Sequence, residues 1–528
     1  MDDFEQTRLN TDKEKEARQH LPSTSLDEEP QFKHSYLGNG YECMLLGVTT
    51  VLGGQLYGWN AGFSSGFGSY FVGQVMVGLA YIVLLSCLGE MSATLAFPGG
   101  TYGVARAVLG FFPGFLVGCF ECCEYLFMST ASVVYIGQLF VSFTNSDPSL
   151  QPALWFIFYT FTILTTCFDA RIFWATSTTL AIVCIVLLLI YSLGSLQYVN
   201  LAVNGPYFNN TATYVNTSIL SHFNLTDNSL LTTRIMHSSG QNYTQILMTP
   251  LLPGPTRDPS YWFVGGFNAW LSGLQYCTWG FAGIESLTLM TSMTKDPKQA
   301  ISFGCSYGVI VLFCTCILTV VVCGAMPPGL FVTSGLDTFM SVGYMMMFPG
   351  LSYLATLAMI LPGQIGMAWG FVVPLGTLLS SLATSNLLPS FFMLRGAKSP
   401  RRGIIIGCFL GYIICLIGFY VPAFSAALQP IAIASAMMCY FSSLLAFYKL
   451  RTTFGMLPRE YTTPYGLIGA AYCFCVFVLV FVSTVFFQGD PTHTCLISLI
   501  GIMGVLSLYY FCFAKHDQTF SKDEQKTG

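Results

Sequence analysis

The sequence predicts an all-α membrane protein with about twelve transmembrane helices, and three observations support this fold class. Only 9% of the 528 residues are Asp, Glu, Lys or Arg, whereas an ordinary soluble domain has about 25%. Hydrophobic residues make up 53% of the chain, and the mean hydropathy is +0.62. The apolar residues gather in stretches long enough to cross ~30 Å of hydrocarbon. This composition excludes a large soluble enzyme, a nucleic-acid-binding protein and a disordered scaffold.

The predicted chain begins with a polar tail, which is followed by the membrane spans and a second polar tail. Residues 1–41 are expected to form a disordered cytosolic tail, because they are polar throughout. Residues 328–350 are expected to form an irregular outer segment bounded by prolines, and residues 515–528 a cytosolic C-terminal tail. The predicted spans are 42–67, 70–96, 110–141, 151–168, 174–196, 261–293, 303–325, 351–384, 403–421, 424–448, 466–488 and 493–514.

The first and sixth spans carry signs of interruption. Each runs to about 25 residues or more and has glycines and polar groups near mid-depth, within 53–62 and 279–285. Unwound backbone is tolerated in a bilayer only where protein or a water-filled cavity satisfies it. Interrupted spans at corresponding places in two halves of a chain indicate a transporter's substrate site, whereas close helix packing is the alternative explanation for the glycines.

These two spans would open two units of five helices, and an odd number of helices makes the two repeats inverted. The predicted transmembrane domain, 42–514, therefore has a first repeat at about 42–196 and an outer loop at 197–260. A second repeat at about 261–448 and two extra helices at 466–514 follow.

The basic residues predict the orientation. With both termini inside, 19 of the 21 Lys and Arg fall in inner segments, and the outer loops hold only Arg234 and Arg257. The outer loop also contains four Asn-x-Ser/Thr sequons, which are glycosylation candidates in a secretory-pathway membrane. These sequons begin at Asn209, Asn216, Asn224 and Asn242. We therefore expect a glycoprotein in the plasma membrane or the endolysosomal membrane of a eukaryotic cell, with both termini cytosolic.

Apart from Glu42 at the very start of the first span, four acidic residues and no Lys or Arg remain in the predicted spans: Glu90, Glu121, Glu124 and Glu285. Intramembrane carboxylates usually face the bundle interior and serve a function. Glu121 and Glu124 share one helix face, and two close carboxylates without a base cannot easily both ionise. They therefore suit a proton carrier or a cation site. Glu285 could stabilise the start of the second half of the sixth helix, and Glu90 could instead make a structural bond to a loop.

Several segments resemble the amino acid–polyamine–organocation (APC) permeases. They are Glu90-Met91-Ser92-Ala93, Pro98-Gly99-Gly100-Thr101-Tyr102 with Arg106, Phe281-Ala282-Gly283-Ile284-Glu285, and Lys295-Asp296-Pro297-Lys298. Gly58-Trp59-Asn60-Ala61-Gly62 and Glu121-x-x-Glu124-Tyr125 look most like the ethanolamine-permease branch. The resemblance implies twelve helices, ten of them in a five-plus-five inverted repeat. It also implies a substrate between the breaks of helices 1 and 6, flanked by helices 3 and 8.

We therefore expect a secondary active transporter of a small organic amine, with ethanolamine as the best guess, that works by alternating access. A neutral or basic amino-acid permease and a transporter-like membrane receptor or sensor are the alternatives, and an enzyme is not expected. The expected substrate-binding residues are Gly54, Gln55, Gly58, Trp59, Asn60, Glu121, Glu124, Trp279, Phe281, Gly283 and Glu285. The two tryptophans would offer cation–π faces.

No cofactor or metal is expected, although H⁺ or Na⁺ is a possible coupling ion. The sequence contains no Gly-x4-Gly-Lys-Ser/Thr motif, which argues against ATP-driven pumping. Most of the 19 cysteines lie in apolar runs without zinc spacing, and buried free cysteines behave as small hydrophobic residues. The expected partners are the small substrate and the lipid bilayer, with no nucleic acid.

Overall fold

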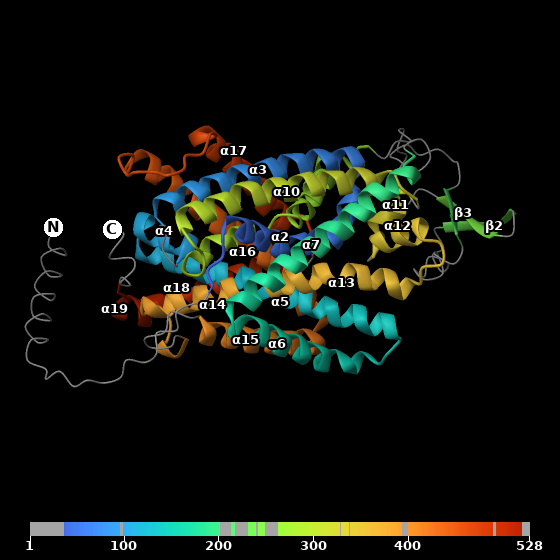
Figure 1. Ribbon diagram of the computed structural model, residues 1–528. Helices are drawn as coiled ribbons and strands as arrows, with labels where there is room; N and C mark the ends of the chain where they lie inside the picture. The colour runs from blue at the N-terminus through green and yellow to red at the C-terminus, as the bar shows by residue number, and fades with distance from the viewer. Residues whose placement is uncertain are drawn as a thin grey trace, which may run out of the picture.

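The fold is a bundle of long helices that run between two ends of the molecule (Figure 1). The computed structural model describes residues 36–95, 99–200, 213–216, 231–238, 241–248, 262–327, 329–336, 338–392, 400–488 and 493–519. Within this part, 10 helical segments are long and apolar enough to cross a membrane. The prediction of an all-helical, multi-pass membrane protein is thus confirmed.

The long helices have the following bounds: α2 Gly40–Leu56, α3 Phe67–Thr94, α5 Phe111–Thr144, α6 Gln151–Cys167, α7 Ala170–Gly194, α10 Pro297–Gly324, α13 Tyr353–Gly370, α14 Val372–Thr384, α15 Arg401–Tyr420, α16 Pro422–Thr452, α17 Gly466–Phe486 and α18 Thr494–Tyr509. The shorter α-helices are α4 Gly100–Leu109, α9 Gly266–Gly273, α11 Leu330–Ser334, α12 Phe339–Met347 and α19 Lys515–Asp517. The 3₁₀ turns are η1 Trp59–Ser65, η2 Pro148–Leu150, η3 Ser195–Tyr198, η5 Leu274–Thr278, η6 Ile284–Met293 and η7 Ser390–Phe392, and η8 Tyr510–Ala514 is a π turn.

The ten continuous spans leave out the first and sixth predicted spans, and both of these are interrupted. Helix α2 ends at Leu56, and Gly58 then takes a φ of 81° before η1 begins. In the sixth span, η5 ends at Thr278, and Gly283 takes a φ of 98° before η6 begins. Left-handed backbone of this kind favours glycine because it has no Cβ. The prediction of broken helices 1 and 6 is confirmed.

The two interrupted spans lie against each other at the centre of the bundle. Helix α2 packs against α7, α10 and α13, and η6 packs against α2, α3 and α10. A Cβ added to Gly54 would lie 1.8 Å from the carbonyl oxygen of Trp279. Only glycine therefore allows the first break to approach the second so closely.

The end of the bundle that carries the strands, here called the sheet end, lies opposite α4 and α19 (Figure 1). The strands β1 Thr213–Asn216, β2 Leu231–Ser238 and β3 Gln241–Met248 form an antiparallel sheet in the order β1-β3-β2. They belong to the predicted outer loop, so this loop contains extended structure. Sequon residues Asn216 and Asn242 lie in strands, whereas Asn209 and Asn224 lie outside the described residues. The segment expected to be irregular at 328–350 contains the short helices α11 and α12.

At the opposite end, here called the α4 end, a late residue ties three elements together. Thr519 lies just beyond α19, and its carbonyl oxygen accepts a hydrogen bond of 2.8 Å from the Arg106 guanidinium of α4. Its backbone N–H donates to the carbonyl of Ser385, which follows α14, and its hydroxyl accepts from the Asn386 side chain. The chain after the last long helix therefore joins α4 to the end of α14.

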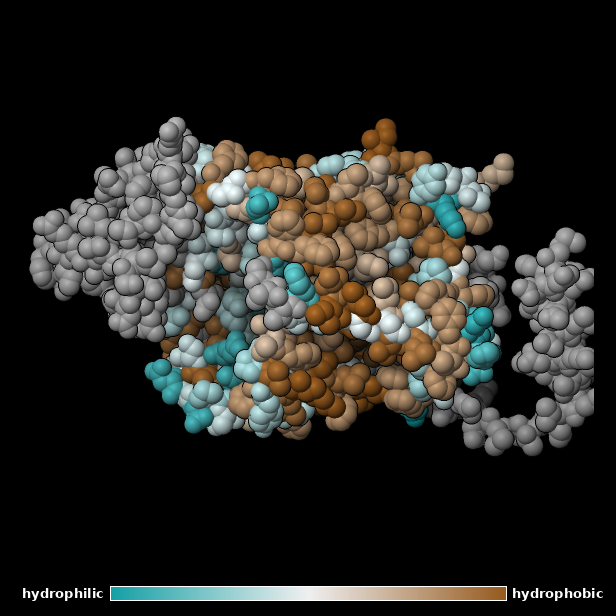
Figure 2. Space-filling model, turned by 180° about the vertical axis from the view of Figure 1, so that it is seen from behind, coloured by the Kyte–Doolittle hydropathy of each residue, from teal (hydrophilic) through white to brown (hydrophobic). Residues whose placement is uncertain are grey.

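The surface agrees with a membrane environment. Figure 2 shows hydrophobic side chains across the middle of one face and hydrophilic ones mainly toward its ends. Large apolar side chains are exposed on helices that lie far apart in the sequence, including Ile157 on α6, Phe409 on α15 and Val505 on α18. Lipid rather than water suits such a surface.

Candidate functional site

The candidate site begins at the first break, where Gln55 joins three elements. Its side-chain N–H donates to the carbonyl of Leu312 on α10 at 2.8 Å and to the carbonyl of Gly280 at 3.4 Å. Its side-chain oxygen accepts a hydrogen bond of 2.9 Å from Thr315. This fully buried amide therefore holds the end of α2 to α10 and to the second break.

Trp59 and Asn60 follow this break and are also engaged with protein. The indole N–H of Trp59 donates to the carbonyl of Gln55 at 2.7 Å, which satisfies an acceptor at the end of α2. The Asn60 amide donates to the carbonyls of Thr333 and Leu336 at 2.6 and 2.8 Å. The ring of Trp59 packs among Phe63, Tyr70 and Phe339. In this conformation both side chains fix η1 against the α11 segment.

An aromatic group spans the two breaks. The Tyr57 and Tyr135 ring centroids lie 3.6 Å apart, and those of Tyr57 and Trp279 lie 5.9 Å apart. Tyr276 lies 6.4 Å from Trp279. Tyr57, Tyr276 and Trp279 are only half-buried. A Cβ on Gly58 would lie 2.5 Å from the Trp279 ring, so this glycine also makes room for the group.

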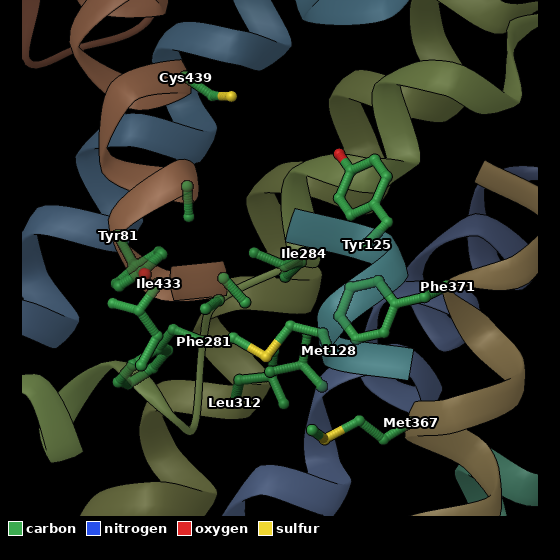
Figure 3. Close-up of a cluster of buried hydrophobic side chains, with 14 of the residues drawn as sticks. Tyr81, Tyr125, Met128, Phe281, Ile284, Leu312, Met367, Phe371, Ile433 and Cys439 are labelled. Atoms are coloured by element: carbon green, nitrogen blue, oxygen red, sulfur yellow. The ribbon is translucent and has the colours of Figure 1, made fainter. Parts of the chain in front are cut away.

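Apolar side chains close around the second break. Figure 3 shows Phe281, Met128 and Leu312 gathered there, with Tyr81 and Ile433 beside Phe281. The Phe281 ring stacks on Tyr81 at 5.2 Å between centroids. A Cβ on Gly283 would lie 2.3 Å from the Phe371 ring. The predicted residues Phe281 and Gly283 thus lie in a tightly packed layer in this conformation.

Three carboxylates meet directly beside this layer, toward α4. Tyr440 of α16 donates to one oxygen of Glu285 at 2.8 Å, and the backbone N–H of Gly283 donates to the same oxygen at 3.1 Å. Tyr125 donates to Glu121 at 2.8 Å. Glu124 interacts electrostatically with both Glu285 and Glu121. The sequence spacing predicted that Glu121 and Glu124 lie close together. The structure shows that Glu285 interacts with Glu124 as well.

The carboxylates are buried and are only partly satisfied. Glu121, Glu124 and Glu285 are 0%, 0% and 1% exposed. Within the described structure, both oxygens of Glu124 and one oxygen of each partner lack a hydrogen bond. The sequence contains no Lys, Arg or His in 67–94, 111–144 or 262–294, which form part of the walls of this cluster. Such a site can hold a proton or bind a cationic group.

Glu90 has a different role. Arg451 lies 2.5 Å from its carboxylate and Arg459 3.4 Å from it, and the backbone N–H of Thr463 donates to it at 2.8 Å. This buried carboxylate therefore joins α3 to the segment between α16 and α17. The structural interpretation of Glu90 is the one that these contacts support.

The sequence did not point to Tyr440, Tyr81 or the threonines near the cluster. Tyr440 lies in an apolar helix, where a tyrosine is indistinguishable from a packing residue until its neighbour is known. Tyr81 packs against Tyr440 with ring centroids 5.7 Å apart. A weak signal existed, since a buried tyrosine hydroxyl usually requires a hydrogen-bond partner.

Comparisons with known proteins agree with this architecture. A family model described as amino acid permease matches residues 43–506, which is most of the chain. A curated relative, an uncharacterized transporter of Rhizobium meliloti (strain 1021), is 34% identical over 97 residues. That match spans 18% of this chain and 20% of the relative, so the chain covers only about a fifth of the relative's length.

Proposed function

The chain belongs to the amino acid permease family, and on this basis we propose that it is a secondary active transporter of a small organic amine. Ethanolamine is the proposed substrate, and alternating access is the proposed mechanism. The chemistry of the breaks and of the carboxylates supports the substrate class.

One observation carries this proposal: Glu121, Glu124 and Glu285 form a buried cluster, and 67–94, 111–144 and 262–294 around it contain no Lys, Arg or His. A positive charge would compensate these carboxylates, whereas an anionic group would be repelled by them. An organic ammonium group can supply that charge. A proton can replace it when the substrate is absent.

The half-buried aromatic group supports the same substrate class. Tyr57 and Trp279 lie at the two breaks, where their ring faces can attract an ammonium group as it approaches. Phe281 and Met128 pack together at the second break in the present conformation (Figure 3). We propose that these apolar side chains move aside during transport, because the ammonium group must otherwise stay apart from Glu124.

In this proposal the other predicted residues shape the site. Gly54, Gly58 and Gly283 permit the close packing of the breaks, while Gln55, Trp59 and Asn60 hold them through hydrogen bonds. Movement of helices 1 and 6 would break or exchange these bonds. We therefore propose that these hydrogen bonds stabilise the present, closed conformation of the transporter.

A neutral or basic amino-acid substrate is the second candidate, and the description of the matching family favours it. A zwitterion carries both an ammonium and a carboxylate group. Its carboxylate would require backbone N–H groups at the breaks, away from the glutamates. Competition between amines and amino acids separates the two candidates.

The experiment is uptake into proteoliposomes that contain the purified full chain. Labelled ethanolamine, choline and amino acids are compared, each with and without sodium and pH gradients. We expect ethanolamine uptake, and Glu124→Gln should reduce its initial rate at least about tenfold, or ~1.4 kcal/mol. Glu460→Gln is the matched control, since Glu460 is exposed in the segment between α16 and α17. Unchanged uptake and unchanged pH dependence in both Glu121→Gln and Glu124→Gln would contradict the proposal.

A further inference from the structure

A small cavity at the α4 end has an unusual polar lining. It lies among α3, α4 and η6, and its lining includes Ser92, Thr101, Thr288 and Thr291. Thr101, Thr288 and Thr291 are 4%, 2% and 8% exposed. In the described structure, the hydroxyls of Thr288 and Thr291 have no hydrogen-bond partner, whereas Thr101 interacts with the Glu121 carboxylate. Buried hydroxyls normally have a partner, so two unpartnered ones at one cavity indicate a site for a polar species.

The cavity adjoins the carboxylate cluster. Thr101 and the backbone of Tyr102 lie beside the Glu121 carboxylate. Glu121 is in turn one helical turn from Glu124, which interacts with Glu285. A series of oxygen atoms therefore leads from the second break to the cavity under α4.

Gly100 brings the two sides of the cavity together. It has a φ of 51°, and a Cβ there would lie 2.7 Å from the Thr288 hydroxyl. This glycine therefore lets the start of α4 lie directly against η6. The close approach places the hydroxyl of Thr101 on one wall and those of Thr288 and Thr291 on the other.

We propose that the Thr101, Thr288 and Thr291 hydroxyls form a proton route between the carboxylate cluster and the α4 end. Each hydroxyl can accept a proton on its oxygen and donate its own hydrogen onward to a water molecule that bridges the hydroxyls in the cavity. The carboxylate that releases the proton becomes an anion, and the proton leaves as hydronium at the end of the route. This inference rests on the proposed function only in assigning the proton to transport.

The groups around the carboxylates are compatible with proton exchange. The titratable side chains that face the cluster are Tyr81 of α3, Cys122 and Tyr125 of α5, Cys305 of α10, and Cys439 and Tyr440 of α16. None of these is a base. Among the described residues, no group of three or more His, Cys, Asp or Glu could hold a metal ion. A proton, which needs few ligands, fits better than a metal ion.

Infrared spectroscopy of the full chain in lipid nanodiscs tests the route without any transported substrate. The carbonyl band of protonated carboxyl groups is followed after transfer from H₂O to D₂O. Glu121→Gln and Glu124→Gln identify the part of the band that belongs to the cluster. In the Thr101→Val/Thr288→Val/Thr291→Val variant, we expect exchange of that part to slow at least about tenfold, or ~1.4 kcal/mol on the barrier.

Matched variants separate the route from folding. The corresponding triple Thr→Ser variant keeps the hydroxyls and should exchange at the wild-type rate. Thr130→Val is a further control, because the Thr130 hydroxyl bonds to its own helix at Leu126. The single variant Thr288→Val should show a smaller slowing if the triple variant does not fold. A wild-type rate in both valine variants, or a band that responds to sodium and not to pH, would overturn the route.

The result also separates this inference from the proposed function. Slower exchange in a protein that transports neither amines nor amino acids would support the route and reject the proposed transport. If the protein transports amines and its valine variants exchange at the wild-type rate, the proposed transport is supported and the proton route is rejected.

Discussion

At the scale of single residues, two glycines with positive φ can be compared: Gly283 lies at the break of the sixth span, and Gly110 lies between α4 and α5. Gly283 has a φ of 98°, and a Cβ at this position would meet the Phe371 ring. Gly110 has a φ of 110°, yet a Cβ there would have no atom within 4 Å. The pair therefore allows backbone strain to be separated from steric conflict.

We predict that Gly283→Ala lowers the thermal stability of the protein more than Gly110→Ala does. Gly283→Ala incurs about 1–2 kcal/mol for a left-handed alanine. Gly110→Ala incurs about 1–3 kcal/mol, because the φ of 110° and ψ of 174° at Gly110 lie in a region nearly restricted to glycine. Only the first also displaces Phe371 from its stacking on Tyr125. Thermal unfolding followed by fluorescence-detected size exclusion measures the difference. If both variants lose the same thermal stability, the contact between the methyl group added at position 283 and the Phe371 ring does not destabilise the protein.

The same scale shows what could and could not be predicted from the sequence. Glu121 and Glu124 could be paired because their spacing follows from helix geometry. Their meeting with Glu285 depended on the packing of η6 against neighbouring helices, which spacing does not encode. Gln55 was expected to contact substrate, but its three hydrogen bonds to α10 and Gly280 depend on distant parts of the chain.

At the scale of elements, Glu90 holds α3 to the segment between α16 and α17 through Arg451 and Arg459. We predict that Arg451→Gln/Arg459→Gln destabilises the protein by about 1–3 kcal/mol, because the buried carboxylate loses charged hydrogen-bond partners. The partial exposure of Arg451 places the expected loss at the lower end of this range.

The rescue of this double variant is the sharper measurement. Adding Glu90→Gln removes the buried charge and should recover part of the lost thermal stability. Transport driven by the carboxylate cluster should respond little to any of the three changes. A triple variant that is less stable than the double variant would contradict this account of Glu90.

Elements also differed in how well the sequence defined them. The long apolar spans were predictable because the bilayer requires about 20 apolar residues per helix. The breaks were predictable because glycines and polar groups coincide there. The helices α4, α11 and α12 were not assigned, since they have only 10, 5 and 9 residues and are too short to be recognised as membrane spans.

At the scale of the whole molecule, the orientation is a prediction from the charges and the sequons. We predict that the protein expressed in eukaryotic cells carries N-linked glycans in 197–260. Treatment with peptide N-glycosidase should therefore increase its electrophoretic mobility. Replacing Asn209, Asn216, Asn224 and Asn242 by Gln should abolish that shift.

The control for orientation is a new sequon placed between α14 and α15, at the predicted cytosolic side. This sequon should remain unmodified in the variant that lacks the four natural ones. Glycosylation of the new sequon would show that the predicted orientation is wrong. If none of the four natural sequons is glycosylated, the orientation rests on the distribution of Lys and Arg alone.

The bond between Thr519 and Arg106 has a consequence for biosynthesis. The two residues are 413 positions apart, so α4 and α5 leave the ribosome long before Thr519 is made. Arg106, which is 1% exposed in the folded protein, lacks one of its hydrogen-bond acceptors until Thr519 has been made. A nascent chain that stops before this residue would present an incompletely bonded guanidinium at the α4 end.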